Sequence, residues 1–468
     1  MRKAILIVLL ACSMLISLAG CNTIKGETSS SLASKNQNQL TQKEKIDDFE
    51  YMYTILKENY PFFEVNKRVN GLDWLGNKDE YINKIKSTQN DEDFSKTLGY
   101  ILRDLHNGHT NILNSQDYTD FLNLYSQDPP WANQLNNIKA VNRYTKQSNY
   151  EASKISLQTE SYSKYPTART TNLRNQNNVS SHNIKTEILS REDKVAYLKI
   201  SSFDKFKMEK DLLTLKPFLN SVKDYTKLII DIRGNGGGAD AYWEDNIVPM
   251  LINKPLSIKY YFAYTGGKFE EEFIQYKLGI GCEELEQIST ITNEKLKNPP
   301  PELFKSFKYY YKYEKVIQPI DSINFKGKIY LLVDNGVGSS ADGFAAFAKS
   351  TGFATLIGEK TFGEGIGQDP LVCVLPNSGY VFRFPMVMGL ASDGTCNEEF
   401  KTKPDVEVSQ KWYNNLLNDK AIKYIMTGKM KYISILEVVA LFLVLILVIG
   451  IIRFKLRSQK VIRRGSTN

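Results

Sequence analysis

Two of the three histidines of this 468-residue chain lie close together, in the stretch DLHNGHT at residues 104–110. An imidazole, with an ordinary pKa of about 6.5, is well suited to take a proton from a serine hydroxyl and return it to a leaving amine. His106 and His109 are therefore candidate bases. If the helix continued through both residues, they would share one face and could bind a metal ion. However, the sequence offers no third ligand and no HExxH spacing beside them. His106 could instead donate a hydrogen bond to the free carbonyls at a helix C-terminus. His182 is interpreted as a surface residue.

A candidate nucleophile lies in the second of two glycine-rich loops. The first loop, DIRGNGGGAD at 231–240, offers backbone N–H groups without side-chain obstruction, although a sharp turn has the same composition. The second, VDNGVGSSADGFAAFA at 333–348, reads as a strand, a tight turn and a helix of small residues. This pattern places Ser339 and Ser340 in the positive field of a helix N-terminus. A serine at that position is also the ordinary N-cap, so the motif alone leaves both roles open.

The elements that position these loops are helices in the first part of the chain and strands in the rest. Residues 49–60 and 91–105 have the apolar spacing of amphipathic helices, and the second helix would deliver His109 at its C-terminal end. Residues 115–185 show neither helical nor strand periodicity and are expected to form an irregular insertion. Apolar runs then predict buried strands of an α/β core, at 194–203, 227–234, 328–335, 354–361 and 379–390.

Four motifs in order resemble the core of the C-terminal processing peptidase and tricorn protease family of serine peptidases. They are LIIDIRGNGGG, VDNGVGSSADGFAAFAKS, ATLIGEKTFGEG and PDVEV. DFEYMYTILKENYPFF and LRDLHNGHT resemble the helical N-terminal region of its tricorn-like branch. The resemblance implies an α/β fold with a crotonase-like ββα spiral core over residues 186–410, preceded by a helical domain over 41–114. It also implies cleavage of peptide bonds in unfolded or C-terminal segments. From the residues themselves we expect no metal or other cofactor.

The resemblance implies a role for each residue of the two loops. The family nucleophile falls on Ser339, the first serine of GSSADGF. The oxyanion hole falls on the backbone N–H of Ser340 and on that of Gly237 in NGGG, with Gly236 open as the alternative. In other serine hydrolases each such donor stabilises the oxyanion by roughly 3 to 4 kcal/mol.

The chain departs from the family pattern at two positions. In the processing peptidases a lysine serves as the base, and Glu364 occupies its position in this chain. A carboxylate is not assumed to substitute for that lysine, so we expect no Ser-Lys dyad. We also expect Glu364 to take no part in catalysis. The histidine base of the tricorn branch falls on His109, and its supporting glutamate falls on Glu398. Tricorn has a serine before the histidine, where this chain has Gly108. The link between His109 and Glu398 therefore needs a water molecule or another route.

Both ends of the chain predict attachment to a membrane. Residues 1–20 read as a lipoprotein signal peptide, with Cys21 as the lipidated N-terminus and 21–40 as a polar tether. Residues 433–452 form an apolar run of 20 residues, long enough for a transmembrane helix. The basic tail at 453–468 then lies in the cytoplasm by the positive-inside rule, and the catalytic domain lies outside the cell membrane.

Charge and cysteine content argue against several partners. The first residues and the tail hold eight of the 60 Lys and Arg residues, and the remaining 52 balance the 52 Asp and Glu. We therefore infer no nucleic-acid partner. The cysteines that remain after processing, Cys282, Cys373 and Cys396, are odd in number and lack CxxC spacing, which argues against a disulfide framework or a zinc site.

Two function classes follow from the sequence, and a non-peptidase hydrolase is a weaker third option. The first is a membrane-anchored, extracytoplasmic serine endopeptidase that acts on peptides or proteins. The second is a catalytically inactive homologue that uses the same pocket for binding, and Glu364 and Gly108 are its support. The joint presence of Ser339, His109 and Glu398 favours the active enzyme. The sequence indicates neither a particular substrate nor an oligomeric state.

Overall fold

The computed structural model describes residues 39–145, 183–409, 415–428 and Ile449. The predicted signal peptide, Cys21, most of the tether, His182 and the basic tail lie outside the described residues. So does the predicted span at 433–452, apart from Ile449. Within the described ranges, no helix has the length and apolar character needed to cross a bilayer.

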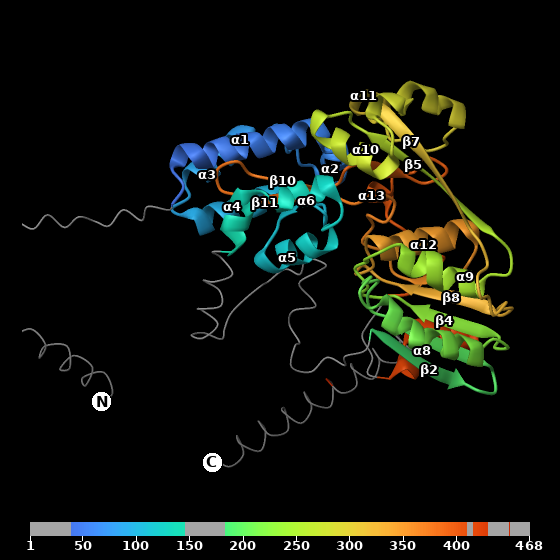
Figure 1. The fold of residues 1–468 in the computed structure, drawn as a ribbon. Helices are drawn as coiled ribbons and strands as arrows, with labels where there is room; N and C mark the ends of the chain where they lie inside the picture. The colour runs from blue at the N-terminus through green and yellow to red at the C-terminus, as the bar shows by residue number, and fades with distance from the viewer. Residues whose placement is uncertain (1–38, 146–182, 410–414, 429–448, 450–468) are drawn as a thin grey trace, which may run out of the picture. The chain divides into compact units, whose positions relative to one another are not determined.

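The N-terminal region is helical, as the periodicity predicts (Figure 1). Helix α1 begins with a capping box, in which the Thr41 hydroxyl accepts from the Glu44 N–H and the Glu44 carboxylate accepts from the Thr41 N–H. The faces of α1 and α4 that carry Phe49, Leu56 and Leu98 are fully buried. The four helices are α1 (Gln42–Asn59), α2 (Phe63–Asn70), α3 (Lys78–Lys86) and α4 (Asp91–Arg103).

The prediction of an irregular insertion over 115–185 is wrong for its first part. Helix α5 (Ser115–Leu124) follows a side-chain cap from Asn114, and α6 (Pro129–Leu135) begins with proline at its first position. Residues 138–145 are also helical. Each helix is too short to show a clear period against its polar neighbours, and a few large aromatic side chains bury it instead. Trp131 is fully buried, and the rings of Tyr118 and Tyr144 stack 4.1 Å apart.

A six-stranded sheet forms the centre of the core, in the order β13-β9-β8-β4-β3-β2. All neighbouring strands are parallel except β2 and β3. The strands are β2 (Ile184–Ser190), β3 (Val195–Ile200), β4 (Lys227–Asp231), β8 (Lys328–Val333), β9 (Thr355–Gly358) and β13 (Val406–Glu407).

Both faces of this sheet are covered, which explains the continuous apolar runs of its strands. Leu228 and Ile230 of β4 belong to the main core together with residues of α8 (Met208–Ser221) and α12 (Ser340–Thr351). Ile229 points to the opposite face and joins a second cluster with Ile422 of α14 (Lys420–Thr427). Alternate side chains of a strand are thus buried on opposite sides.

Two smaller sheets connect the helical region with the core. The first has the order β12-β5-β7-β6, and the second the order β1-β11-β10. The predicted strand at 379–390 is divided into β11 and β12 around Pro385, which has no N–H to donate to a ladder. The strands are β1 (Asn111–Ile112), β5 (Leu256–Tyr264), β6 (Glu286–Gln287), β7 (Tyr309–Ile317), β10 (Leu371–Val374), β11 (Val381–Phe384) and β12 (Met388–Leu390).

Pairing of β1 with β11 holds the histidine loop against the core. Asn111 pairs with Arg383, and the Arg383 side chain donates to the Gly108 carbonyl at 3.0 Å. His109 lies between these two contacts in the sequence. A strand of only two residues therefore determines where the N-terminal loop meets the α/β core.

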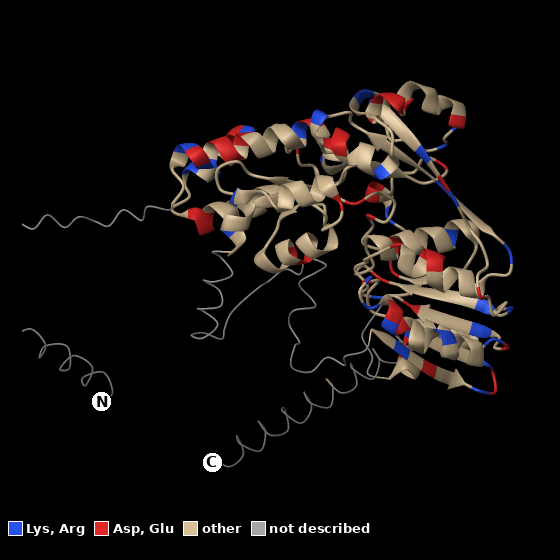
Figure 2. Cartoon of the chain, in the orientation of Figure 1, with Lys and Arg blue, Asp and Glu red and all other residues tan. Residues whose placement is uncertain are grey.

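Lys and Arg are interspersed with Asp and Glu along the elements of the structure (Figure 2). Short helices and turns complete the described residues. The α-helices are α9 (Val248–Leu251), α10 (Glu271–Leu278), α11 (Leu303–Ser306) and α13 (Asn397–Phe400). The remaining turns are a π-helical turn at Trp243–Ile247 and 3-10 turns at Lys268–Glu270, Cys282–Glu284, Ile288–Glu294 and Leu416–Asn418. The chain is thus a mixed α/β protein with a helical N-terminal region.

Candidate active site

Ser339 lies between strand β8 and helix α12 in a backbone conformation that serine rarely adopts. Its φ is +52° and its ψ is −136°, and such a positive φ in a non-glycine residue costs about 1–3 kcal/mol. The N–H of Ser339 donates to the Gly363 carbonyl at 3.0 Å. Its side chain makes no capping hydrogen bond with α12. The ordinary N-cap interpretation therefore fails, and the hydroxyl is left for another role.

The glycine loop packs directly against Ser339. A Cβ atom on Gly237 would lie 2.8 Å from the Ser339 Cβ and 2.8 Å from the Gly338 carbonyl oxygen, so only glycine fits there. The Gly237 N–H itself donates to Asn235 Oδ1 at 2.9 Å. Within the described residues, the N–H groups of Gly236 and Ser340 make no hydrogen bond. The first N–H groups of a helix such as α12 lack intrahelical partners.

His109 binds a carboxylate that the sequence places outside the site. Its Nδ1 lies 2.8 Å from Glu364 Oε2, and the two side chains are 19% and 5% exposed. The backbone N–H of Gly108 donates to the other oxygen, Glu364 Oε1, at 2.5 Å. With Nδ1 engaged, Nε2 is the ring nitrogen that remains for a reacting group. The structure therefore brings Glu364 into contact with the candidate base, although the sequence analysis expects no part for it in catalysis.

Gly108 makes the approach of Glu364 sterically feasible. A Cβ at this position would lie 2.8 Å from Phe362 Cε1 and 3.2 Å from Glu364 Oε2. Burial acts to raise the pKa of Glu364. The nearby His109, the Gly108 N–H and Lys401 outweigh burial, so the pKa lies below its ordinary value. Glu364 is therefore ionised at neutral pH. No bridging serine or water is needed between this carboxylate and His109.

Glu398 reaches the histidine loop through Asn107. Asn107 Nδ2 donates to Glu398 Oε1 at 3.1 Å, while Asn107 Oδ1 accepts from the His109 N–H at 3.0 Å. The second oxygen, Glu398 Oε2, accepts from Lys401 Nζ at 3.1 Å. Burial and the negative charge of Glu364 raise the pKa of Glu398 to about 8. Glu398 therefore supports the backbone of His109, and among the described contacts it makes none with the ring.

Asp342 and Asn397 are two positioning residues that the sequence does not single out. Asp342 is fully buried on α12, where its Oδ1 accepts from Thr361 Oγ1 at 2.6 Å and its Oδ2 accepts from Asn397 Nδ2 at 2.9 Å. Asn397 Oδ1 in turn accepts from the Gly365 N–H at 2.8 Å. This network ties the helix after Ser339 to both sides of Glu364. In the sequence, the one indication of this network is the acidic residue Asp342 in SSADG.

The loop at 361–365 is what joins Ser339 to the histidine. Gly363 pairs with Gly338, and the Phe362 ring lies against both Gly338 and Gly108. Within the described residues no hydrogen bond connects the Ser339 hydroxyl with His109. Catalytic hydrogen bonds are often long without substrate and tighten when it binds. The arrangement thus places the candidate nucleophile and the candidate base on two sides of one shared loop.

His106 has a different environment from His109. It is exposed, has a φ of +52° and lies after the last turn of α4. Its Nδ1 lies 3.1 Å from the Asp104 carbonyl oxygen and 3.1 Å from Asn66 Oδ1. These contacts suit the expected role at a helix C-terminus. Among the described residues, the cysteines are free and buried, and they are Cys282, Cys373 and Cys396.

Comparisons with known proteins identify the family and the fold. The profile of peptidase family S41 matches residues 194–408, and that of the tricorn protease C1 domain matches residues 41–103. No curated protein matches the chain. A putative peptidase from Parabacteroides merdae has the same fold, with a TM-score of 0.51, 20% identity and coverage of 83% of this chain and 98% of its own.

Two further solved structures are similar at a lower level. Mature CPAF complexed with lactacystin has a TM-score of 0.48 and 13% identity, and the match covers 82% of this chain and 95% of CPAF. The photosystem II D1 C-terminal processing protease has a TM-score of 0.39 and 15% identity, with 79% and 94% covered. The family profiles therefore confirm the resemblance seen in the sequence. Residues 194–408 belong to peptidase family S41, and the chain is a serine-type peptidase.

Proposed function

We propose that the chain is an endopeptidase in which Ser339 attacks the peptide carbonyl and His109 is the base. The observation that carries the proposal is the contact between His109 Nδ1 and Glu364 Oε2 at 2.8 Å. It leaves Nε2 as the nitrogen that can accept a proton. The core of β3, β4, β8 and β9 with α8 and α12 is taken to be the crotonase-like spiral that the family resemblance implies.

The reaction follows the general course of serine acyl transfer. The Ser339 oxygen forms a bond to the carbonyl carbon while its proton passes to His109 Nε2. The carbon–nitrogen bond then breaks, and the same proton goes to the leaving amine. Water repeats the sequence on the acyl-enzyme and releases the second product. Glu364 holds the required tautomer of His109 and stabilises the imidazolium, and it keeps its own negative charge throughout.

Backbone N–H groups supply the oxyanion hole in this proposal. Ser340 contributes the first N–H, because it starts α12 and has no intrahelical partner. The second comes from the glycine loop. Gly237 lies against Ser339 but donates to Asn235, so it must share or exchange that bond, whereas the Gly236 N–H makes none among the described residues. We keep Gly237 as the donor, with Gly236 as the alternative.

An inactive binding homologue is the second candidate function. The absence of a hydrogen bond between Ser339 and His109 among the described contacts is the observation that favours it. The strained φ of Ser339 and the buried Glu364 argue against it. A protein that only binds peptides has no need to keep a serine in a costly conformation or an ionised carboxylate behind a histidine.

Fluorophosphonate labelling tests the proposal directly, since this probe reacts only with an activated serine. We expect the parent chain to be labelled and the Ser339→Ala and His109→Ala variants to remain unlabelled. His106→Ala is the matched control, because His106 contacts the end of α4, and it should be labelled like the parent. A folded parent that fails to react would transfer support to the binding homologue.

We propose in addition that the peptidase is anchored outside the cell membrane. The signal-like residues 1–20, Cys21 and the apolar run at 433–452 support this placement. Incorporation of an alkyne fatty acid into the parent, and its loss in Cys21→Ser, would establish the lipid anchor. A C-terminal epitope tag should resist external protease on intact cells while the catalytic domain is digested. Digestion of both would contradict a span at 433–452.

A further inference from the structure

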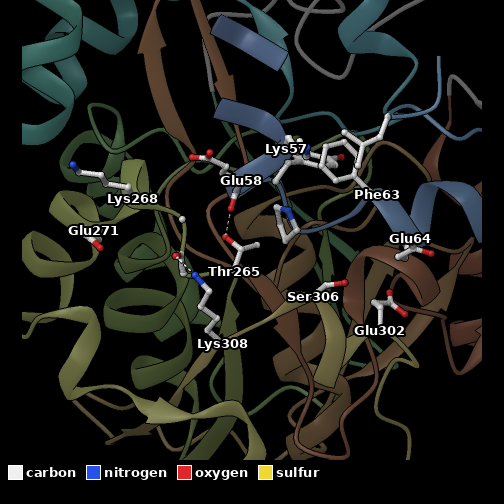
Figure 3. A pocket seen from close by; sticks show the side chains of 15 residues that line it. Lys57, Glu58, Phe63, Glu64, Thr265, Lys268, Glu271, Glu302, Ser306 and Lys308 are labelled. Atoms are coloured by element: carbon white, nitrogen blue, oxygen red, sulfur yellow. Dashed lines mark hydrogen bonds between the residues drawn. The ribbon is translucent and has the colours of Figure 1, made fainter. Parts of the chain in front are cut away.

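A cavity of about 660 Å³ lies next to the active site (Figure 3). This cavity has no part in the reaction proposed above. One wall comes from the turn between α1 and α2 and carries Tyr60, Pro61 and Phe63, with Leu75 beyond it. The opposite side comes from the segment after β5 and from the end of α11, which contributes Ser306. Its volume falls within the range of small-ligand sites, about 300–1,000 Å³.

The cavity and the active site share a thin wall. Phe62 lines the small hollow that holds His109 and Glu364, whereas its neighbours Tyr60 and Phe63 line the cavity. The rings of Tyr60 and Phe62 meet edge to face with centroids 5.9 Å apart. One turn of the chain thus faces the catalytic groups on one side and the cavity on the other.

Further contacts join the surroundings of the cavity to those of the active site. Arg68 Nη2 lies 3.1 Å from Glu302 Oε1, which lines the cavity, and 2.5 Å from Glu399 Oε2, next to the active-site Glu398. On the other side, Tyr264 Oη donates to Gln368 Oε1 at 2.9 Å, and Gln368 lines the hollow beside His109. The cavity is therefore fixed relative to the catalytic residues by ion pairs and hydrogen bonds.

The lining of the cavity indicates the chemistry of its ligand. Phe63 and Leu75 are only partly buried and offer an apolar surface. At the rim, Lys57, Lys268 and Glu271 make no ion pair or hydrogen bond through their side chains within the described residues. Unpaired charges of both signs disfavour a phosphate or other polyanion and disfavour a lipid. An apolar wall with mixed charges and a serine hydroxyl suits a stretch of polypeptide.

We propose that this cavity is a substrate subsite, which binds an unfolded stretch of polypeptide away from the scissile bond. An apolar side chain of the substrate packs on Phe63 and Leu75, and flanking charged residues pair with the rim. The inference rests on the proposed peptidase function and deepens it. Binding energy from such a remote segment holds the scissile bond at Ser339, and peptides too short to reach the cavity lose that energy.

The test fills the cavity without removing a buried contact. Ser306 is exposed at the end of α11 and its hydroxyl makes no hydrogen bond among the described residues, so Ser306→Trp adds bulk at the rim. Ser221, exposed at the end of α8, provides the matched control Ser221→Trp. Binding of fluorescein-labelled β-casein, an unfolded chain, is measured by anisotropy in full-length protein that carries Ser339→Ala.

We expect Ser306→Trp to weaken casein binding tenfold or more and Ser221→Trp to leave it unchanged. Equal affinities in the two variants would overturn the subsite. In the active enzyme, the same substitution should lower kcat/KM for casein and leave kcat/KM unchanged for a peptide too short to reach the cavity. An equal loss for both substrates would overturn the proposal too, because the substitution would then act on the catalytic groups. Because the binding measurement needs no catalysis, it decides the subsite even if the parent fails to label with fluorophosphonate.

Discussion

Nδ1 of His109 lies 2.8 Å from Oε2 of Glu364, and the Gly108 N–H holds the other oxygen of that carboxylate at 2.5 Å. A buried, ionised carboxylate behind the imidazole sets its tautomer and stabilises its positive charge during proton transfer. Glu364, which occupies the position of the lysine in the processing peptidases, is thus the partner of His109 in this chain.

Glu364→Gln should lower kcat for peptide hydrolysis about 10²-fold or more. The amide presents an N–H group to Nδ1, which favours the wrong tautomer of His109 and removes the charge that stabilises the imidazolium; a comparable change in another serine protease lowers kcat about 10⁴-fold. Steady-state kinetics with a fluorogenic peptide measure the effect. Glu192→Gln, on an exposed turn, is the control. Full activity in Glu364→Gln would remove Glu364 from the machinery.

Gly108→Ala should lower kcat/KM about tenfold or more while the fold is retained. The added Cβ would lie 2.8 Å from the Phe362 ring and 3.2 Å from Glu364 Oε2, so the carboxylate must move away from His109. Gly99→Ala is the matched control, since its Cβ would meet nothing within 4 Å and alanine favours a helix. Circular dichroism and peptide cleavage are measured on both. Equal activity of the two variants would contradict a close fit at Gly108.

Ser339→Gly should unfold at a higher urea concentration than Ser339→Ala. Both lack the nucleophile, but glycine adopts a φ of +52° without strain, whereas alanine keeps the cost of about 1–3 kcal/mol. The greater entropy of glycine in the unfolded chain offsets part of this gain, which leaves an expected difference of about 1 kcal/mol. If the alanine variant were the more stable, the conformation of Ser339 would carry no strain.

Glu398 should contribute to a fall in stability between about pH 4.5 and 8, in the same direction as Glu270, whose pKa burial also raises to about 8. The pKa of Glu398 is raised to about 8 in the folded chain, so the folded state holds a proton that the unfolded state has released. This contribution is complete below the ordinary pKa and is lost as pH rises through the folded pKa. Glu364 acts in the opposite direction: its pKa is lowered, so its contribution is lost in acid. Urea midpoints across this pH range should show a smaller decline in Glu398→Gln than in the parent.

An unchanged pH slope in Glu398→Gln would show that another group causes the decline. Glu192→Gln again serves as the exposed control and should follow the parent. The comparison also separates the two carboxylates, because Glu364→Gln should alter the acid side of the curve instead. Distinct pH windows are expected for two buried carboxyls of which only one is ionised at neutral pH.

The sequence by itself determined the helices and strands whose apolar residues follow a regular period. The apolar spacing of α1 and α4 and the continuous runs of β4 and β8 follow from the periods of helix and strand, which need no knowledge of distant contacts. The family motifs in the sequence likewise point to Ser339, the glycine loop and His109. The helices between residues 115 and 145 escaped detection because they are short and are buried by a few aromatic side chains.

Only the tertiary structure decided which carboxylate meets His109. Glu364 and Glu398 both lie far from His109 in the sequence, in a loop and in a four-residue helix where no period reports the direction of a side chain. The direction depends on the positive φ of Glu364, on the missing Cβ of Gly108 and on the network around Asp342. These are contacts between segments brought together by folding, and their geometry is set by steric fit and hydrogen bonding that residue order does not express.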